Sequence, residues 1–552
     1  MMNTTSAPKL GLADLASRIH NYKLGLLAVV TLINSFISLT FALVTTWAGR
    51  MNAHSSLSDV LWFCVKGLLL YLIVYLGLYL TEVVTNSILK EACVSLEVDC
   101  LRKYLATPNH SEDEIVSIVS QDVRMIRENY YIPILTLPTY LCRSLIPIIY
   151  LLTQNLSVGI CFAVGAGLMM LPQHFMAHGL ADLGNHFSQQ REYSLSAAID
   201  LAKGKTVINN HQAQPFFLKL TRRKFEQTER AEQHLHNTQA LMFSLSGPLK
   251  GIADVVPFAL GIYLMRFDPR ITIVLLVAML GTAGSLKNQF QEIIYLSGDL
   301  LETKAVRAKI GTFLHQPTPQ RVAATPALSD FVGLTLSDVS KKFADHLLFA
   351  HVDLSLSAGQ KVLITGKSGV GKSTFLDLLM QNQQPDSGTI YLRTGGKQPQ
   401  NITDFQQNIS LIAQQPHLFN LSIRDNICLG KPIADAELTA ILKQVDLSQQ
   451  LGEAPLDFLI QQNGANISGG QRLKIEIARA LADRKQIILA DEITASLDPD
   501  SAKTIRDLLL RLPVTVIEVA HHYTNLDYYD QIWRFADQTV QAQGTDLAAD
   551  KK

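Results

Sequence analysis

The sequence predicts two joined parts, an all-α membrane domain of six spans followed by an α/β domain with a helical subdomain. Two observations carry this prediction. Apolar residues form 48% of the 552 residues and concentrate before residue 300. Further on, the stretch "KVLITGKSGVGKSTFLDLLM" at 361–380 reads as an apolar strand, a glycine-rich loop and a helix. A chain of this length has room for at least two domains.

Six apolar stretches reach the length needed to cross a bilayer. They cover residues 24–48, 60–80, 131–153, 156–177, 248–265 and 271–286, and we expect the last helix to continue into "LKNQFQEII". Short connections alternate with the long polar segments 81–130 and 178–247, whose charged residues at helical spacing predict helices. A soluble helical core would have to bury all six stretches, so we expect a membrane domain.

Basic residues indicate how the chain crosses the membrane. Lys and Arg are frequent in the two long polar segments, whereas the short loops hold Arg50, Arg266 and Arg270. Since Lys and Arg favour the cytoplasmic side, we expect both termini and both long segments in the cytoplasm. The compact chain suits the plasma or inner membrane of a bacterium.

Three ionisable residues fall inside the predicted spans. These are Lys66, Arg143 and Asp254. An ionisable group at that depth is a candidate for a functional role, although no substrate charge follows from these residues. It could equally pair with a neighbouring helix or extend to the interface, and the sequence leaves both possibilities open.

Charge and cysteine content exclude several classes of protein. The 48 basic residues balance the 48 acidic ones, so the totals give no sign of a nucleic-acid partner. The six cysteines have no metal-binding spacing, and most lie in or beside apolar runs, which argues against a disulfide framework. The Pro- and Ala-rich stretch "HQPTPQRVAATPALSD" predicts a linker. We therefore expect a membrane domain at 1–315, a linker at 316–330 and a second domain at 331–552.

The glycine-rich loop has the pattern of a phosphate-binding loop. Gly366, Gly371, Lys372 and Ser373 satisfy G-x-x-x-x-G-K-[ST] between a strand and a helix. Glycines let backbone amides approach phosphate oxygens, while Lys372 would neutralise the β- and γ-phosphates and Ser373 would ligate Mg²⁺. This predicts a P-loop NTPase domain that binds ATP through Gly366, Lys367, Ser368, Gly369, Val370, Gly371, Lys372, Ser373 and Thr374.

A second catalytic element is the stretch "QIILADE". Four apolar residues, 487–490, suit a strand buried in a parallel sheet. Asp491 then stands at the carboxyl end of the strand, where it can hold Mg²⁺. Glu492 follows and is placed to accept a proton from an attacking water.

The order of short motifs resembles the ATP-binding cassette (ABC) transporters. "GKSGVGKST", "LIAQQPHLF", "ISGGQ", "ILADE", "SLD" and "VAHH" follow one another, and with six spans ahead of them the chain resembles an exporter-type half-transporter. The resemblance implies that Gln414 contacts Mg²⁺ and the attacking water, and that His521 bonds the γ-phosphate. It also implies that Phe343 stacks on adenine, although a phenylalanine there could equally belong to the core.

The same resemblance implies that each ATP site needs two chains. In the family, Ser468, Gly469, Gly470 and Gln471 cover the nucleotide on a facing subunit's phosphate loop, and Asp498 contacts that subunit. We therefore expect a dimer, built either from two copies or from this chain and a related half-transporter. Two cytoplasmic segments, at about 107–116 and 206–217, would transmit motion between the domains.

Two departures from the family pattern concern the signature. Ile467 replaces the usual leucine, and the preceding "LIQQNGA" lacks the charged residues that exporters typically carry there. Lys372, Glu492 and His521 are all present, so the catalytic half-site is complete. We expect an ATP-hydrolysing exporter of amphipathic or lipophilic compounds such as drugs, lipids or peptides. The alternatives are an uptake system, an ATP-gated regulator, or a soluble cassette ATPase, against which the six spans argue.

Overall fold

The chain folds into two compact units, residues 1–319 and 320–552. The computed structural model describes residues 10–51, 54–107, 110–316, 331–343, 346–367, 369–395, 408–413, 416–462, 464–494, 497–520, 526–536 and 538–544. Most of the linker predicted at 316–330 falls outside these ranges, so the predicted domain boundaries stay a prediction.

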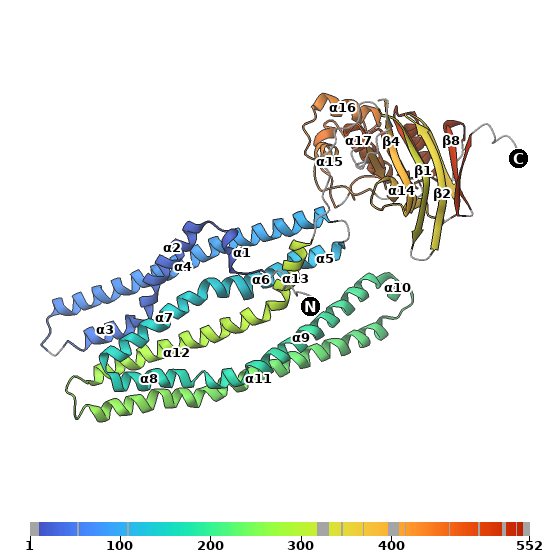
Figure 1. The fold of residues 1–552 in the computed structure, drawn as a ribbon. Helices are drawn as coiled ribbons and strands as arrows, with labels where there is room; N and C mark the ends of the chain where they lie inside the picture. The colour runs from blue at the N-terminus through green and yellow to red at the C-terminus, as the bar shows by residue number, and fades with distance from the viewer. Residues whose placement is uncertain are drawn as a thin grey trace. The chain divides into compact units, whose positions relative to one another are not determined.

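The first unit is built from helices, as Figure 1 shows. They are α1 (Leu12–Ser17), α2 (Asn21–Ser35), α3 (Thr40–Ala48), α4 (Leu57–Ala106), α5 (Glu112–Ser117), α6 (Val123–Ile126), α7 (Ile132–Gln154), α8 (Leu156–Leu168), α9 (Leu171–Lys203), α10 (Lys205–Asn210), α11 (Gln214–Leu264), α12 (Ile273–Glu302) and α13 (Lys304–His315). A 3₁₀ turn, Phe36–Leu39, joins α2 to α3, and π turns at Ile118–Asp122 and Arg127–Tyr131 flank α6. Both long polar segments are helical, because α4 runs on to residue 106 and α9 and α11 form a long hairpin with α10 at its tip.

The helices of this unit match the predicted spans with one difference. Within the described residues, five helical stretches are long and apolar enough to cross a membrane: 21–48, 57–106, 114–154, 214–264 and 273–300. The predicted span 156–177 is interrupted, because α8 ends at Leu168 and α9 begins at Leu171. Pro172 explains the break: it lacks an N–H and its ring clashes with the preceding turn, so it is favoured in the first turn of a new helix.

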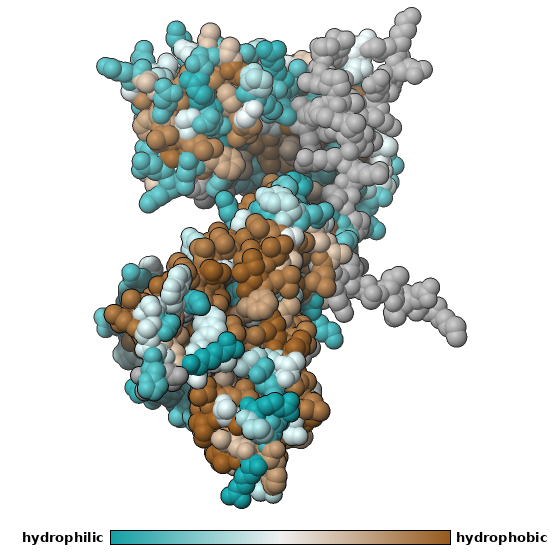
Figure 2. All heavy atoms as spheres, turned by 90° about the vertical axis from the view of Figure 1, so that its left-hand side faces the viewer, coloured by the Kyte–Doolittle hydropathy of each residue, from teal (hydrophilic) through white to brown (hydrophobic). Residues whose placement is uncertain are grey.

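The surface of the first unit is strongly apolar. Figure 2 shows hydrophobic side chains over much of it, and on α4 alone Leu68, Leu72 and Ile73 are more than half exposed. Soluble monomers rarely expose apolar patches of this extent. The exposed apolar faces of helices long enough to span a bilayer confirm the prediction of a membrane domain.

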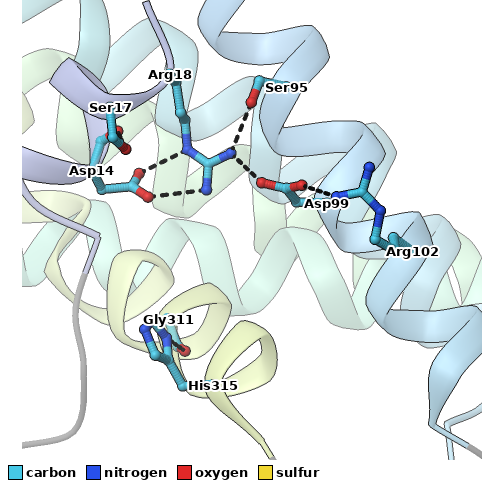
Figure 3. A network of polar contacts seen from close by, with 8 residues as sticks. All are labelled: Asp14, Ser17, Arg18, Ser95, Asp99, Arg102, Gly311 and His315. Atoms are coloured by element: carbon cyan, nitrogen blue, oxygen red, sulfur yellow. Dashed lines mark hydrogen bonds and ion pairs between the residues drawn. The ribbon is translucent and has the colours of Figure 1, made fainter. Parts of the chain in front are cut away.

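A charged cluster fastens the short N-terminal helix to the first unit. Arg18, just after α1, donates from Nε and Nη2 to both carboxylate oxygens of Asp14, at 3.0 and 2.9 Å. Its Nη1 donates to Asp99 of α4 at 2.6 Å and to Ser95 at 3.2 Å. Figure 3 shows the guanidinium lying between the two carboxylates. A guanidinium held by two carboxylates fixes α1 against α4.

The second unit contains two sheets. β1 (Phe331–Phe343), β2 (His346–Ser357) and β4 (Ser387–Thr394) form an antiparallel sheet in the order β2-β1-β4. The larger sheet has the order β5-β6-β7-β3-β8-β9, from β5 (Ile409–Ile412), β6 (Ile487–Asp491), β7 (Thr515–Val519), β3 (Lys361–Gly366), β8 (Gln531–Ala536) and β9 (Thr539–Gly544). β5, β6, β7, β3 and β8 run parallel. Their carboxyl ends therefore meet at one edge, the usual place for a ligand.

Two apolar cores hold this unit together. One lies between the sheets and contains Phe349, Phe375 of α14 (Lys372–Leu379) and the fully buried Trp533. The other joins the parallel sheet to α15 (Ile423–Cys428), α16 (Asp435–Gln444), α17 (Gly469–Ala482) and α18 (Pro499–Arg511). The helical subdomain predicted from the sequence corresponds to α15–α17.

Candidate functional site

The glycine-rich loop leaves β3 in a conformation that needs its glycines. Gly366, Gly369 and Gly371 have φ angles of 151°, 82° and 100°, which side chains disfavour. A Cβ atom on Gly366 would also lie 2.8 Å from the carbonyl oxygen of Phe535. α14 begins directly after Gly371, so the loop ends at the N-terminus of a helix, where backbone N–H groups can bind an anion. Lys367 and Val370 lie in the same loop, and Ser368 falls outside the described residues.

Lys372 folds back across this loop. Its Nζ donates to the carbonyl oxygens of Gly366 at 2.8 Å and Lys367 at 3.0 Å, and the side chain is buried. Burial lowers the pKa of Lys372, while the carboxylates of Glu492 and Asp491 oppose that shift. The loop therefore holds a cation close to where phosphate oxygens would bind.

Oxygen ligands suited to Mg²⁺ meet beside the loop. Ser373 Oγ lies 3.4 Å from Asp491 Oδ2, and Thr374 follows it in the first turn of α14. Burial, and next the charge of Glu492, raise the pKa of Asp491. A hard cation bound there would relieve the repulsion between these two carboxylates, and a hydroxyl with a carboxylate is a donor set that Mg²⁺ accepts. The residues present therefore fit the predicted Mg²⁺.

Glu492 leaves the sheet in an unusual backbone conformation. Its φ angle is 48°, and its N–H donates to the carbonyl oxygen of Val519 at 3.0 Å. A non-glycine residue in the left-handed region is uncommon and often marks a functional site. The hydrogen bond to β7 fixes the chain so that Glu492 directly follows the carboxyl end of β6.

The Ser-Gly-Gly turn begins α17 with a capping box. Gln471 N–H donates to Ser468 Oγ at 3.2 Å, and Ser468 N–H donates to Gln471 Oε1 at 2.9 Å. Gly469 and Gly470 have no side chains to cover the turn, and the atom that a Cβ on Gly470 would first meet is Ser468 Oγ at 4.0 Å. Backbone N–H groups at this turn can therefore approach an anion. α17 packs on α15, α16, α18 and β5, whereas α14 packs on β6, so different elements carry the loop and the turn.

A buried polar cluster, absent from the sequence-based prediction, joins α17 to the segment after β5. Arg479 donates from Nε to the carbonyl oxygen of Asn426 at 2.6 Å and from Nη2 to Asn426 Oδ1 at 2.8 Å. Its Nη1 donates to the carbonyl oxygen of His417 at 2.8 Å and to Glu476 at 2.6 Å. Burial raises the pKa of Glu476, and Arg479 opposes that shift. The sequence did contain one signal for this cluster: Glu476 and Arg479 are charged residues on the face of α17 that its apolar pattern predicts to be buried.

A second cluster anchors Thr494, which lies two residues after Glu492, to α18. Arg506 of α18 donates to Thr494 Oγ1 and to the buried Glu518, both at 3.0 Å. Tyr529 Oη donates to the other oxygen of Glu518 at 2.5 Å. Asp498 caps α18 by accepting from Ser501 N–H at 3.0 Å. Hydrogen bonds from the side chain and then from the backbone of Ser501 lower the pKa of the Asp498 carboxyl. These contacts anchor Thr494 to α18 and Asp498 to the start of the same helix.

Three further predicted site residues, Phe343, Gln414 and His521, lie on other segments of the second unit. Phe343 ends β1 and is 68% exposed, so it does not belong to the core. Stacking on adenine stays a prediction for it. Gln414 and His521 lie outside the described residues, but they follow the carboxyl ends of β5 and β7, the edge that also carries Gly366 and Asp491.

Comparison with known proteins finds the same kind of nucleotide-binding domain and a similar fold. The model of the ABC transporter family matches residues 349–495. A solved structure described as a bacterial Atm1-family ABC exporter with ATP bound superimposes with a TM-score of 0.75 over 95% of both chains, at 18% identity. This chain carries the ABC transporter domain and has the ABC exporter fold. These comparisons confirm the predicted fold class and the predicted ABC transporter domain at 349–495, while the roles of single residues stay predictions.

Curated relatives align over part of their length. The glutathione/L-cysteine transport system ATP-binding/permease protein CydC of Escherichia coli (strain K12) is 33% identical over 40% of this chain and 39% of that protein. The ATP-dependent lipid A-core flippase of Pseudoalteromonas translucida (strain TAC 125) is 32% identical over 37% of this chain and 36% of that protein. This chain thus aligns with less than half the length of each relative.

Proposed function

We propose that the chain is one half of a dimeric ABC exporter that hydrolyses ATP at sites shared between two subunits. One observation carries the proposal: the phosphate loop ends on α14, which packs on β6, while the capped Ser468 turn belongs to α17, which packs on α15, α16 and α18. One chain thus supplies two separate phosphate-binding helix starts. A facing subunit would bring its own α17 turn to the nucleotide on this chain's loop.

Each residue near the loop has a task in this proposal. Lys372 would exchange its bonds to the loop carbonyls for bonds to the β- and γ-phosphates. Ser373 and Asp491 would hold Mg²⁺, which neutralises phosphate charge when bound. Glu492 would accept the proton of the attacking water. Gln414 and His521 would complete the site at the same sheet edge.

Mixed dimers test the shared site. Lys372→Ala removes the loop cation of one chain, and Ser468→Arg obstructs the covering turn of the other. A dimer of two differently tagged chains then has one site with both defects and one with neither. We expect ATP hydrolysis in the doubly purified mixed dimer and almost none in either variant alone. Inactive mixed dimers of normal stability would contradict the shared site.

Glu492→Gln tests the proposed base. The amide keeps the shape of the side chain but cannot accept the proton, and general bases contribute about 10²–10⁴-fold to rates. We expect hydrolysis to fall by about that factor while ATP still binds, as measured with purified protein in lipid nanodiscs. Hydrolysis at the wild-type rate would remove Glu492 from this role.

Membrane location and cargo complete the proposal. We place the chain in a bacterial plasma or inner membrane, with both termini and the ATP-binding domain in the cytoplasm. Lys and Arg are frequent in the two long polar segments, and such residues favour the cytoplasmic side. There the segments at 107–116 and 206–217, which contain the starts of α5 and α11, would relay motion to the ATP-binding domains. The relatives' names, a lipid A-core flippase among them, support an exporter of amphipathic compounds. ATP-dependent uptake into inside-out vesicles would support export, and uptake into right-side-out vesicles would contradict it.

A further inference from the structure

Arg143 is a buried cation in the middle of a membrane-spanning helix. It lies in α7, with eleven residues before it and eleven after it in Ile132–Gln154, and it is 9% exposed. The spanning segment that contains α7 is apolar enough to cross a bilayer. A charged group at this depth is costly unless something compensates it.

The fold satisfies a neighbouring cation but leaves Arg143 without a charged partner. Lys287 of α12 pairs with Asp254 of α11, so those two groups compensate each other. For Arg143, the described residues supply the ring of Tyr140, at 5.6 Å from the guanidinium carbon, and no hydrogen bond or ion pair. Its Nε is buried without a hydrogen-bond partner. Glu82 of α4 influences Arg143 electrostatically without reaching ion-pair distance.

The chemistry of the Arg143 guanidinium indicates which kind of ligand would bind to it. A guanidinium presents parallel N–H donors that match a carboxylate, a sulfonate or a phosphate. Tyr140, one helical turn away and half-buried, adds an aromatic face on the same side. A ligand with an acidic group and an apolar body would compensate the charge and keep the surrounding site dry.

We propose that Arg143 binds the acidic group of the cargo, so that the protein prefers anionic amphipathic compounds to neutral ones of the same shape. This inference rests on the proposed transport function. It assigns Arg143 to substrate recognition, whereas Asp254 has its own partner in Lys287 and Lys66 is exposed on α4.

The test compares an acid with its ester. The probes are 11-(dansylamino)undecanoic acid and its methyl ester, titrated into the nucleotide-free full chain in nanodiscs of neutral lipid, with empty nanodiscs subtracted. We expect the wild type to bind the acid about tenfold more tightly than the ester. Arg143→Gln should bring that ratio to about one, Arg143→Lys should keep part of it, and the control Lys66→Gln should keep all of it.

Several results would overturn the proposal. Equal affinity for acid and ester in the wild type is one, and a ratio that survives Arg143→Gln is another. If Arg143 instead pairs with a carboxylate of a second copy, Arg143→Gln will dissociate the dimer in size-exclusion chromatography without changing the ratio. If it binds a lipid headgroup, adding phosphatidylglycerol to the nanodiscs will abolish the ratio in the wild type.

The design separates this proposal from the proposed transport function. Since binding is measured without nucleotide, a failed preference leaves ATP hydrolysis and the mixed-dimer result untouched. Should Arg143→Gln not fold, Arg143→Lys still decides, because it keeps the charge but loses the paired donors, and an unchanged ratio in it contradicts recognition by the guanidinium.

Discussion

Arg479→Met isolates the polar cluster that joins α17 to the segment after β5. The substitution keeps a long unbranched side chain but removes four hydrogen bonds, to Asn426, His417 and Glu476. It also leaves Glu476 without a cation in a buried setting. Since the methionine can fill the space of the arginine, the stability that is lost comes mainly from the polar contacts.

The expected magnitude follows from these contacts. Breaking a buried ion pair by removing one partner costs about 3–5 kcal/mol. In a unit of this size each kcal/mol lowers the unfolding temperature by about 2–4 °C, so we expect a decrease of about 6–20 °C. Arg484→Met is the matched control: it removes an arginine beside the end of α17 whose side chain is 77% exposed and whose partner is Glu437. Surface pairs of this kind contribute about 0–1 kcal/mol.

The assay measures the fluorescence of Trp533, which is fully buried in the second unit, while the protein is heated. The other two tryptophans, Trp47 and Trp62, are replaced by phenylalanine in the first unit, so fluorescence on heating the full chain in nanodiscs reports the ATP-binding unit. A decrease in Arg479→Met no larger than in Arg484→Met would refute the argument that the cluster holds this unit together.

The same variant should change the pH dependence of stability. Burial already raises the pKa of Glu476, and without Arg479 nothing there opposes that shift. A raised pKa in the folded state means that the associated stability is complete below the ordinary pKa and is lost as the pH rises through the raised value. We therefore expect Arg479→Met to lose more stability at about pH 8 than at about pH 5. An equal loss at both would contradict this assignment.

Two further predictions concern a helix cap and a histidine. Ser468→Ala and Ser422→Ala each remove an N-terminal serine cap and should cost about 1 kcal/mol each, but only Ser468→Ala should also reduce ATP hydrolysis. His110 bonds Glu114 at 2.9 Å and Gln316 at 2.8 Å, and the bond to Glu114 is the main cause of its raised pKa. Its stabilisation should be complete below its ordinary pKa and disappear as the pH rises through the raised one, so His110→Leu should lower the unfolding temperature more at about pH 6 than at about pH 9.

Each of these has a result that would contradict it. Equal loss of hydrolysis in the two serine variants would mean that Ser468 acts through helix stability rather than at the nucleotide. A difference between wild type and His110→Leu that does not change with pH would mean that packing against Phe313, whose ring lies 4.9 Å away, outweighs the charge.

The sequence allowed the prediction of features that have a local pattern. The glycine-rich loop, the strand before Asp491 and the long polar helices are of this kind, because backbone geometry and periodicity follow from neighbouring residues. The predicted spans did not include the break between α8 and α9, since a proline such as Pro172 can kink a membrane helix without ending it. The Arg479 and Arg506 clusters also escaped prediction, because each joins residues far apart in the chain. The lone cation of Arg143 was visible as a residue, but its lack of a charged partner depends on the packing of α4, α7 and α12.

The interruption at Met169 and Met170 divides what would otherwise be a single rigid rod. Before the break α8 is tightly packed, since a Cβ atom on Gly165 would lie 3.0 Å from Ala253 of α11 and one on Gly159 would lie 2.3 Å from the carbonyl oxygen of Leu151 in α7. After the break α9 continues to Lys203 beside α11. We expect α8 and α9 to move separately when the packing around them changes, because the break interrupts the helical hydrogen bonds that would otherwise couple them.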